Sequence, residues 1–576
     1  MSPSAPSRSL AFLLAALALA ALANLAYWGE RGRLQPVPDA GSDTIQSVSF
    51  SPYQRGENPL MHITPTQDEI SSDVAVLAGR VSALRTYTSL EGLDQVAHDA
   101  EPLGIKVEQG IWLGRDPDVN EREVESGISL ANRYPKTITR VIVGNEVLLR
   151  RDLTAGQLLG YIRRVKQEVK QPVTYADVWE YWLKNPELAS AVDLVTIHIL
   201  PYWEDQPVGI DDALGHVLSI YRQVEAAFPG KPIAIGEVGW PSAGRMRDGA
   251  RPSLVNEARL VRGVIRAASA GHFDYNIVEA FDQPWKRQLE GTVGGHWGIL
   301  DADREAKFEL AGPVSNDPDW RWQWAFSTGF AALATLVAAW RRRPYRGLGA
   351  FFLPLAAQFL GTLLVLDVGL TTTISWSPFD WVTGGLGLAA SAILTVPLLK
   401  AVDARACGTI WPQAPIPTVE EALNLLRRRP TPGPSFGERM LGLLQFGFVV
   451  GAVVATLALV IDPRYRDFPS EAFLVPAFGL AFLALTQDRA APKGASLNEE
   501  ALFVTLLLLG VPGIVVSEAL QSMASFTLGS ILDGFGRASD NSQAFGWCGV
   551  LILLALPWAL KLWAPRSSAR PRGATP

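Results

Sequence analysis

Apolar residues follow two different patterns along the chain, and the change falls near residue 320. Before that point, short runs rich in Val and Ile alternate with longer amphipathic stretches, whereas after it long and almost entirely apolar runs follow one another. The short runs predict buried β-strands, and the periodic stretches between them predict helices. Apolar runs of about 17–25 residues have the length of membrane-spanning helices. The pattern therefore predicts an α/β domain followed by an all-α membrane domain.

The first part of the chain contains eight predicted strands separated by helical stretches such as 66–79, 154–169 and 256–270. Strands that alternate with helices of this length form βαβ units with a parallel sheet. Eight such units in about 250 residues fit a closed (β/α)8 TIM barrel better than an open sheet. The strands are expected at 47–50, 81–87, 105–113, 139–143, 172–175, 194–199, 232–235 and 275–280.

The second part carries seven apolar segments, and an eighth lies at the amino terminus. The amino-terminal run, 10–28, has no charged residue and is long enough to cross a bilayer. It is either an uncleaved anchor, which we favour, or a signal peptide cut near Ala23. Both alternatives export the domain that follows. The seven later segments, which predict a polytopic transmembrane domain, are 324–340, 348–366, 381–399, 441–461, 472–485, 501–516 and 545–560.

Basic residues cluster in alternate connections between these segments. Arginines at 341–343 follow the first segment and arginines at 427–429 follow the third, whereas 367–380 contains no Lys or Arg. By the positive-inside rule, both termini and the basic clusters lie in the cytoplasm. The barrel is then expected outside an inner membrane, in a periplasm. The predicted organisation is an anchor at 1–28, a linker at 29–43, the barrel at 44–320, the membrane domain at 321–563 and a cytoplasmic tail at 564–576.

Composition agrees with this division. Of the 576 residues, 48% are hydrophobic and only 19% are charged, which is typical of a membrane protein. The net charge of −6 argues against a nucleic-acid partner. The two cysteines, Cys407 and Cys548, both lie in the second part, so the barrel contains no cysteine metal site. No metal and no cofactor is predicted.

Two of the predicted barrel strands end at a glutamate. The segments are Val141-Ile142-Val143-Gly144-Asn145-Glu146 and Ile233-Ala234-Ile235-Gly236-Glu237. Because the carboxyl ends of barrel strands form the reaction face, both carboxyls are expected on that face. Two carboxylates are the minimum equipment for cleaving a glycosidic bond. One glutamate after a strand is more often half of an ion pair, but two in matching settings favour catalysis.

Three segments resemble motifs of glycoside hydrolase family 17, the β-1,3-glucanase family. They are Val143-Gly144-Asn145-Glu146, Ile235-Gly236-Glu237-Val238-Gly239-Trp240-Pro241-Ser242 and Val278-Glu279-Ala280-Phe281-Asp282-Gln283-Pro284-Trp285-Lys286. The resemblance covers about 44–310, with Gln283 where the fungal and bacterial branch usually has glutamate. It implies a retaining enzyme with Glu146 as general acid/base and Glu237 as nucleophile. Bacterial proteins of similar layout are described as β-(1,6)-glucan synthases, which favours transfer to a sugar acceptor.

Other residues at the predicted strand ends are candidates to bind the sugar or to support the glutamates. By the resemblance, Asn145 bonds the sugar 2-hydroxyl. Tyr202 is a candidate donor to the nucleophile, and Glu279 and Lys286 are expected to form a supporting ion pair. His198 steadies the nucleophile, binds a sugar hydroxyl or is a core histidine, and the sequence does not separate these alternatives. The remaining candidates for sugar binding are Tyr53, Tyr87, Asp177 and Trp285.

The sequence is compatible with two functions. The first is a membrane-tethered enzyme that hydrolyses β-1,3-glucan or transfers its chains, giving branched or cyclic β-1,3/1,6-glucan. Its partners would be the glucan, the lipid bilayer and a glucan synthase or exporter. The second is a glucan-binding barrel that has lost catalysis and is coupled to an exporter or channel. The presence of both glutamates in their motifs favours the enzyme.

Overall fold

The chain forms two units, which are described separately below. A computed structural model describes residues 5–346, 348–409, 419–427, 436–486 and 497–562. One unit spans Arg33–Asn316, and the other joins Met1–Gly32 to Asp317–Pro576. The predicted cytoplasmic tail and two of the basic residues used for orientation, Arg428 and Arg429, lie outside the described residues.

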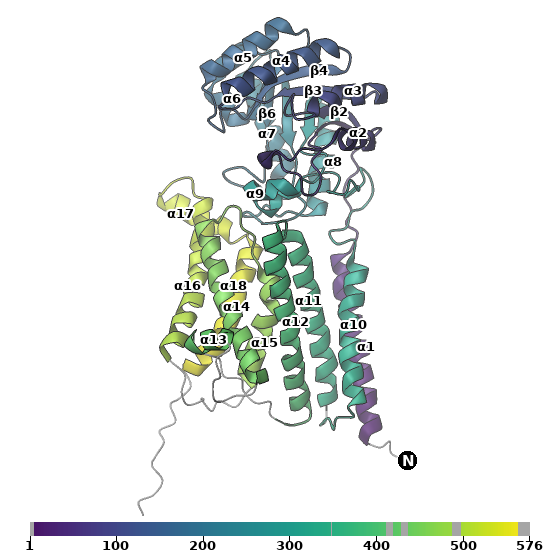
Figure 1. The fold of residues 1–576 in the computed structure, drawn as a ribbon, viewed down its shortest axis with the longest axis vertical. Coiled ribbons are helices and arrows are strands. Elements are labelled where there is room, and N and C mark those ends of the chain that lie inside the picture. The colour runs from purple at the N-terminus through teal and green to yellow at the C-terminus, as the bar shows by residue number, and fades with distance from the viewer. Residues whose placement is uncertain (1–4, 347, 410–418, 428–435, 487–496, 563–576) are drawn as a thin grey trace, which may run out of the picture. The chain divides into compact units, whose positions relative to one another are not determined.

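The first unit is a closed barrel of eight parallel strands in sequence order (Figure 1), which confirms the predicted fold class. Its strands are buried on both faces, as β7 (Ile233–Val238) shows with no exposed residue, and this explains their continuous apolar runs. The other strands are β1 (Ile45–Ser49), β2 (Val81–Arg85), β3 (Lys106–Ile111), β4 (Ile138–Asn145), β5 (Val173–Val178), β6 (Val195–His198) and β8 (Asp274–Ile277).

Amphipathic helices cover the barrel. In α5 (Ala155–Glu168), Thr154 and Gln157 form a capping box at the amino end, and Leu158, Ile162 and Val165 are buried on one face. The remaining α-helices of this unit are α2 (Gln67–Val76), α3 (Val96–Ala100), α4 (Pro117–Arg133), α6 (Trp179–Lys184), α7 (Ile210–Ala227), α8 (Leu254–Gly271) and α9 (Arg287–Glu290). Short 3-10 helices are η1 (Pro59–Met61), η2 (Leu93–Gln95), η3 (Glu101–Leu103), η4 (Pro186–Ser190), η5 (Pro284–Lys286) and η6 (Thr292–Gly295).

The segment expected to be a free linker, 29–43, is structured. Helix α1 (Ala5–Arg31) continues to Arg31, and Gln35 then pairs with Val314 in an antiparallel bridge. Val37 and Ala40 are buried against the barrel unit. The segment 29–43 is therefore divided between the end of α1 and the start of the barrel unit.

The second unit consists of long apolar helices. They are α1, α10 (Trp320–Trp340), α11 (Gly349–Ile374), α12 (Pro378–Ala406), α14 (Phe436–Ile461), α15 (Ser470–Thr486), α16 (Leu497–Gln521) and α18 (Ser542–Leu562), with the shorter α13 (Val419–Leu426) and α17 (Leu528–Ala538). Among the described residues, six helices are long and apolar enough to cross a membrane: α1, α11, α12, α14, α16 and α18. The predicted spans in α10 and α15 are helical but are not among these six, and α15 is shorter.

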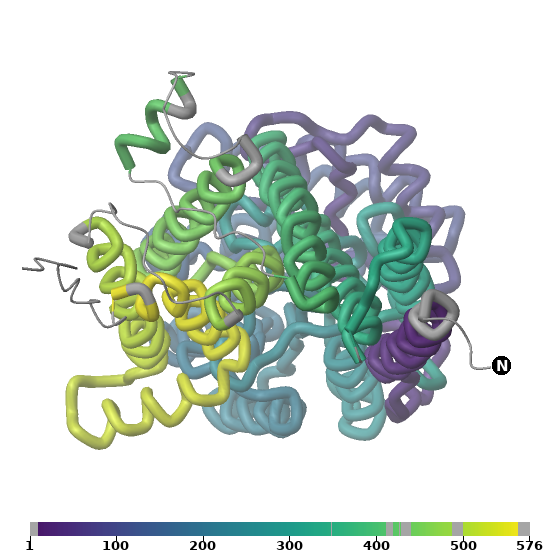
Figure 2. The backbone as a smooth tube through the Cα atoms, turned by 90° about the horizontal axis from the view of Figure 1, so that it is seen from below, coloured from purple at the N-terminus to yellow at the C-terminus, as the bar shows by residue number. Residues whose placement is uncertain are grey.

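The amino-terminal helix packs within this second unit, against α10 and α11 (Figure 2). Asn24 is buried, and its amide donates to the hydroxyls of Ser327 (2.8 Å) and Thr328 (3.0 Å) on α10. Its carbonyl oxygen accepts from the Thr362 hydroxyl of α11 (2.9 Å). The Trp28 indole donates to Ser327 as well (3.2 Å). Side-chain hydrogen bonds therefore join α1 to the helices that follow the barrel.

Candidate active site

Glu146 is the first residue after β4, where the backbone turns sharply. Gly144 has φ +88° and Glu146 has φ +52°, a left-handed conformation that is unfavourable for a residue with a side chain. The Glu146 amide donates to the Ala176 carbonyl of β5 (2.8 Å), which holds the turn. About a quarter of the Glu146 side chain (23%) stays exposed, so this carboxyl is the more accessible of the pair.

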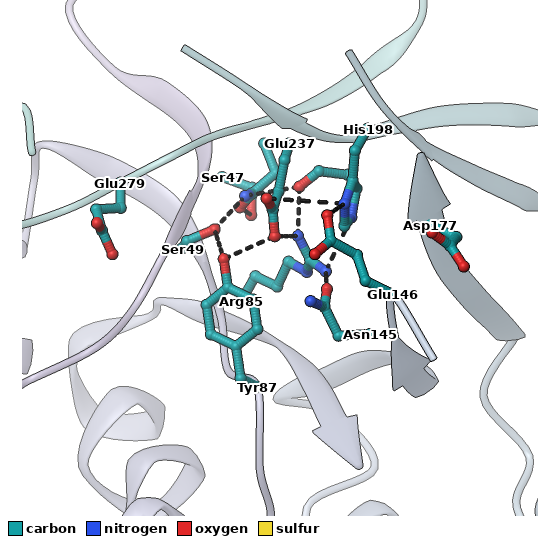
Figure 3. A network of polar contacts seen from close by, with 12 residues as sticks. Ser47, Ser49, Arg85, Tyr87, Asn145, Glu146, Asp177, His198, Glu237 and Glu279 are labelled. Carbon is teal, nitrogen blue, oxygen red and sulfur yellow. Dashed lines mark hydrogen bonds and ion pairs between the residues drawn. The ribbon is translucent and has the colours of Figure 1, made fainter. Parts of the chain in front are cut away.

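Glu237 lies within β7 and is almost completely enclosed, with 9% of its side chain exposed. Its Oε1 accepts hydrogen bonds from the Arg85 guanidinium (Nη1, 2.9 Å) and the Tyr87 hydroxyl (2.8 Å). The Tyr87 oxygen also lies 2.9 Å from Ser49 Oγ, on β1. Two donors, Arg85 on β2 and Tyr87 just after it, therefore hold this carboxylate (Figure 3).

These donors keep Glu237 ionised. Burial is the largest single influence on Glu237 and raises its pKa. His198, Arg85 and the Tyr87 hydrogen bond together outweigh burial, so the pKa of Glu237 lies below its ordinary value. A carboxyl that stays ionised is what a nucleophile requires.

His198, at the end of β6, lies between the two glutamates. Its Nδ1 is 2.9 Å from Glu146 Oε1 and 3.7 Å from Glu237 Oε2. Its Nε2 lies 3.3 Å from Arg85 Nη2, which can only donate. In the tautomer with its proton on Nδ1, His198 can accept from Arg85 through Nε2 and donate to Glu146. The histidine is thus part of the site and not an isolated core residue.

The two carboxyls are close enough for retaining chemistry. The facing atoms of Glu146, His198 and Glu237 all lie within 4.8 Å of one another. Retaining glycosidases hold their two carboxyls about 5 Å apart. Atoms at this spacing can also hold a metal ion, but the Arg85 charge contacts both Glu237 and His198 and opposes a cation there. The residues present therefore fit a carboxylate pair better than a metal site.

Arg85 is a residue of the site that sequence reasoning missed. It is 1% exposed, and its guanidinium donates to Glu237, to the Gly236 carbonyl (2.6 Å) and to Asn145 Oδ1 (2.6 Å). The signal was present, because a single charged residue closes the apolar strand Val81–Arg85, and such a charge is buried only when it is paired. Asn145 Nδ2 forms no hydrogen bond with any described residue, so it can donate to a sugar.

The structure places the predicted tyrosines differently from the expectation. The Tyr202 hydroxyl donates to the Arg245 carbonyl (2.7 Å), and the tyrosine that bonds Glu237 is Tyr87. Tyr202 follows β6 and is fully buried, with its ring edge-on to Trp203, which removes it from the nucleophile. The role predicted for Tyr202 as donor therefore belongs to Tyr87.

Asp177 lies to one side of the glutamate network in Figure 3. It is fully buried on β5, and it accepts from the Tyr175 hydroxyl and the Val178 amide. Burial, together with a smaller effect of the nearby Glu146 carboxyl, raises the pKa of Asp177 to about 6. These bonds engage both carboxylate oxygens, so direct sugar binding by Asp177 stays a prediction.

The last motif contributes a buried ion pair and a held aromatic side chain. Lys286 Nζ lies 2.7 and 2.8 Å from the two Glu279 oxygens, so the expected ion pair is present. Burial raises the pKa of Glu279 to about 7, against the opposing charge of Lys286. The Trp285 indole donates to Gln283 Oε1 (2.8 Å) and stands edge-on to Tyr53 at 5.9 Å.

Gln283 fits its position because its neighbours are carbonyl oxygens. Its Nε2 donates to Ser51 O (2.6 Å) and Phe281 O (3.3 Å). A glutamate there would place a carboxylate against two acceptors and would have to bind a proton. Glutamine at this position is therefore uncharged, and its Oε1 accepts the hydrogen bond from the Trp285 indole.

Comparison with known proteins agrees with this geometry. Residues 47–298 match the family model of the BtgE/BtgC glycoside hydrolase domain. The glucan 1,3-beta-glucosidase BGL2 of Candida albicans is 28% identical over 300 residues, which cover 46% of this chain and 96% of that protein. The putative glucan endo-1,3-beta-glucosidase btgC of Aspergillus niger is 27% identical, over 45% of this chain and 42% of that protein.

Two solved structures of the Rhizomucor miehei β-1,3-glucanosyltransferase are also similar. An active-site mutant in complex with laminaritriose is 30% identical and covers 48% of this chain and 100% of that chain, with a TM-score of 0.42. A second structure, described as glycoside hydrolase family 17, is 31% identical over 46% of this chain and 97% of that chain, with a TM-score of 0.40.

The barrel is an enzyme domain of the glycoside hydrolase class. More narrowly, it is a family 17-like domain of the β-1,3-glucanase and glucanosyltransferase type, attached to a unit of long apolar helices. The residues matched by the family model, 47–298, all lie within the barrel unit.

Proposed function

We propose that the chain is a membrane-tethered retaining enzyme that rearranges β-1,3-glucan outside the cytoplasm by transferring glucan chains. The observation that carries the proposal is the convergence of Glu146, His198 and Glu237 within 4.8 Å on the carboxyl side of a parallel barrel. The names of the fungal relatives, glucosidases and a glucanosyltransferase acting on 1,3-linked glucan, support the substrate class.

The proposed reaction uses the two glutamates in turn. Glu237 attacks the anomeric carbon, the glycosidic bond breaks, and Glu146 gives its proton to the departing oxygen. Glu237 then holds the sugar covalently. In the second step Glu146 takes the proton from the incoming hydroxyl, which displaces Glu237. If that hydroxyl belongs to a sugar, the product is a transferred chain, and if it belongs to water, the product is hydrolysed glucan.

The prediction for the catalytic pair separates an enzyme from a retired binding module. Glu146→Gln and Glu237→Gln should each lower turnover of laminari-oligosaccharides by at least about 100-fold, the scale for losing a positioned acid or base. Azide should partly rescue Glu237→Ala, because it can occupy the space of the nucleophile. The control is Glu108→Gln, a buried barrel glutamate paired with Arg140. A wild type that binds the oligosaccharides without turnover would leave the binding module as the better assignment.

A second prediction separates transfer from hydrolysis. Transfer requires an acceptor sugar held in line with the intermediate, and positioning of this kind gives large effective molarities. The Trp285 ring is immobilised by Gln283 and Tyr53 and offers a stacking surface. We expect the wild type to elongate or branch oligosaccharides at millimolar acceptor.

Trp285→Ala should shift the products towards hydrolysis more than it lowers donor consumption, as measured by product size and linkage. Trp340→Ala, an exposed residue of α10, is the control. If the wild type gave only shorter products at every acceptor concentration, the enzyme would be assigned as a hydrolytic glucanase and not as a transferase. The same proposal includes a branched or cyclic product, and the product analysis tests this product and its linkage. It also includes a glucan synthase or exporter as partner, and co-purification tests that partner.

A further inference from the structure

One end of the membrane unit carries a hollow that the glucan chemistry does not use. It lies where α11 begins and α12 ends, beside the carboxyl end of α15, and has a volume of about 620 Å³. Its lining residues are Arg346, Leu348, Gly349, Phe352, Leu355, Ala356, Val402, Arg405, Ala406 and Phe482.

The walls of the hollow are apolar. Phe352 and Leu355 come from α11, Val402 from α12 and Phe482 from α15. Phe352 is 61% exposed, so the hollow opens outwards along α11 and is not a closed cavity. Gly349 shapes its inner end, because a Cβ at that position would meet the Ala406 carbonyl oxygen at 2.4 Å. The first turn of α11 therefore packs directly on the last turn of α12.

The rim of the hollow is positively charged. Arg346 and Arg405 line it, are exposed, and form no side-chain hydrogen bond or ion pair with any described residue. The neighbouring acid, Asp403, is already engaged by Arg343 (2.9 Å) and by the Tyr345 hydroxyl (2.8 Å). The two rim guanidiniums are thus available to an anion next to an apolar surface.

We propose that this hollow binds a phospholipid with an anionic headgroup from the surrounding bilayer. The phosphate would lie between Arg346 and Arg405, which suit phosphate oxygens geometrically, and an acyl chain would follow Phe352 and Leu355 along α11. Basic pockets between membrane helices bind anionic headgroups in this way. A free phosphate would use the arginines but leave the apolar wall uncovered, so the paired charge and wall point to a lipid.

The test uses the full chain purified in a neutral detergent and examined by native mass spectrometry. Phosphatidylglycerol and phosphatidylcholine with identical acyl chains are added in turn, and inorganic phosphate is added in a third arm. Wild type should retain phosphatidylglycerol at least about tenfold more strongly than phosphatidylcholine. Removing both charges with Arg346→Gln/Arg405→Gln should weaken phosphatidylglycerol about 30-fold, since each arginine near an anionic lipid contributes about a factor of five.

The matched control is Arg341→Gln/Arg342→Gln, which removes two arginines of the same basic connection that do not line the hollow. It should retain the wild-type preference. Leu355→Trp fills the hollow and should weaken lipid binding while leaving the arginines in place. The proposal would be overturned if both lipids were retained equally, or if the two double variants lost phosphatidylglycerol equally. It would also be overturned if the protein bound inorganic phosphate, Leu355→Trp did not change that binding, and lipid did not compete with the phosphate. An unchanged thermal unfolding curve of the full chain in the same detergent shows that each variant is folded, and the single arginine variants repeat the test if the double variant is not.

Discussion

At the scale of single residues, the site is organised by one buried cation. A buried guanidinium is costly unless its donors are satisfied by charge and hydrogen bonds. The two terminal nitrogens of Arg85 bond Glu237, the Gly236 carbonyl and Asn145, while its buried Nε has no hydrogen-bond partner among the described residues. The contacts that stabilise the arginine therefore also orient Glu237, the proposed nucleophile, and the Asn145 amide. We infer that Arg85 is a positioning residue of the reaction.

The prediction at this scale compares two substitutions of Arg85. Arg85→Lys keeps a charge but cannot reach three partners, and a hydrogen bond to a charged group is worth about 1.5–3 kcal/mol, so kcat should fall about 10- to 100-fold. Arg85→Gln also removes the charge that lowers the pKa of Glu237. The pKa of Glu237 then rises, and activity, which needs the ionised form, is lost at a higher pH as the solution is acidified.

The measurement is the pH profile of kcat/KM on laminari-oligosaccharides. The acidic limb should move to higher pH in Arg85→Gln and move less in Arg85→Lys. Arg140→Lys provides the control, because Arg140 is a barrel arginine paired with Asp274 and Glu108 outside the site. An acidic limb that stays in place in Arg85→Gln would show that Arg85 acts only on stability.

The same residues show what sequence could and could not predict. Glu146 and Glu237 could be predicted to lie close together because each ends a continuous apolar run, and a strand end in a barrel has a defined location. The donor to Glu237 was not found, because Tyr87 and Tyr202 both follow strands and only the three-dimensional register decides which hydroxyl reaches the carboxylate. Burial of Arg85 likewise depends on partners from three other strands.

At the scale of elements, strands were predicted better in position than in extent. β8 was expected to run to 280 and ends at Ile277. Beyond Ile277 the hydrogen bonds divide. The Val278 and Ala280 amides still donate to the neighbouring strands, at Val238 O and Ser49 O, whereas the Glu279 amide donates to Trp297 O outside the eight strands. Local pattern marks a buried extended segment, but it does not identify the partner that makes the segment part of the sheet.

The sequence alone does not decide whether the amino-terminal helix is an uncleaved anchor or a cleaved signal peptide. Cleavage near Ala23 would remove Leu13, Ala16 and Ala20, which are buried in the second unit. We therefore predict that α1 is retained, and that the intact mass of the purified protein includes residues before Ala23. Asn24→Leu should lower the thermal stability of the helical unit, because each interhelical hydrogen bond in a membrane is worth about 0.6–2 kcal/mol.

Leu22→Ala is the comparison for Asn24→Leu, since Leu22 lies on the exposed side of the same helix and should change stability little. A mature chain that begins near Asn24 would instead identify the segment as a signal peptide.

At the scale of the whole molecule, the membrane topology depends on whether α10 crosses the bilayer. α10 has 21 residues, a length of about 31 Å at 1.5 Å per residue, which matches a bilayer core of about 30 Å. If α10 crosses together with α15, the basic residues after α10 and after α12 share one side of the membrane and the barrel faces the other. If α10 does not cross, Arg341, Arg342 and Arg343 lie on the same side as the barrel, which the positive-inside rule disfavours.

We therefore predict that α10 crosses and that the barrel lies outside the cytoplasm. A reporter that is active only outside the cytoplasm should work when fused after residue 316, at the end of the barrel unit, and fail when fused after Arg343. Fusion after Ser375, between α11 and α12, should restore activity, because α11 leads back across the membrane. Activity after both 316 and Arg343 would show that α10 lies at the surface, and activity only after Arg343 would place the barrel in the cytoplasm, away from any extracellular glucan.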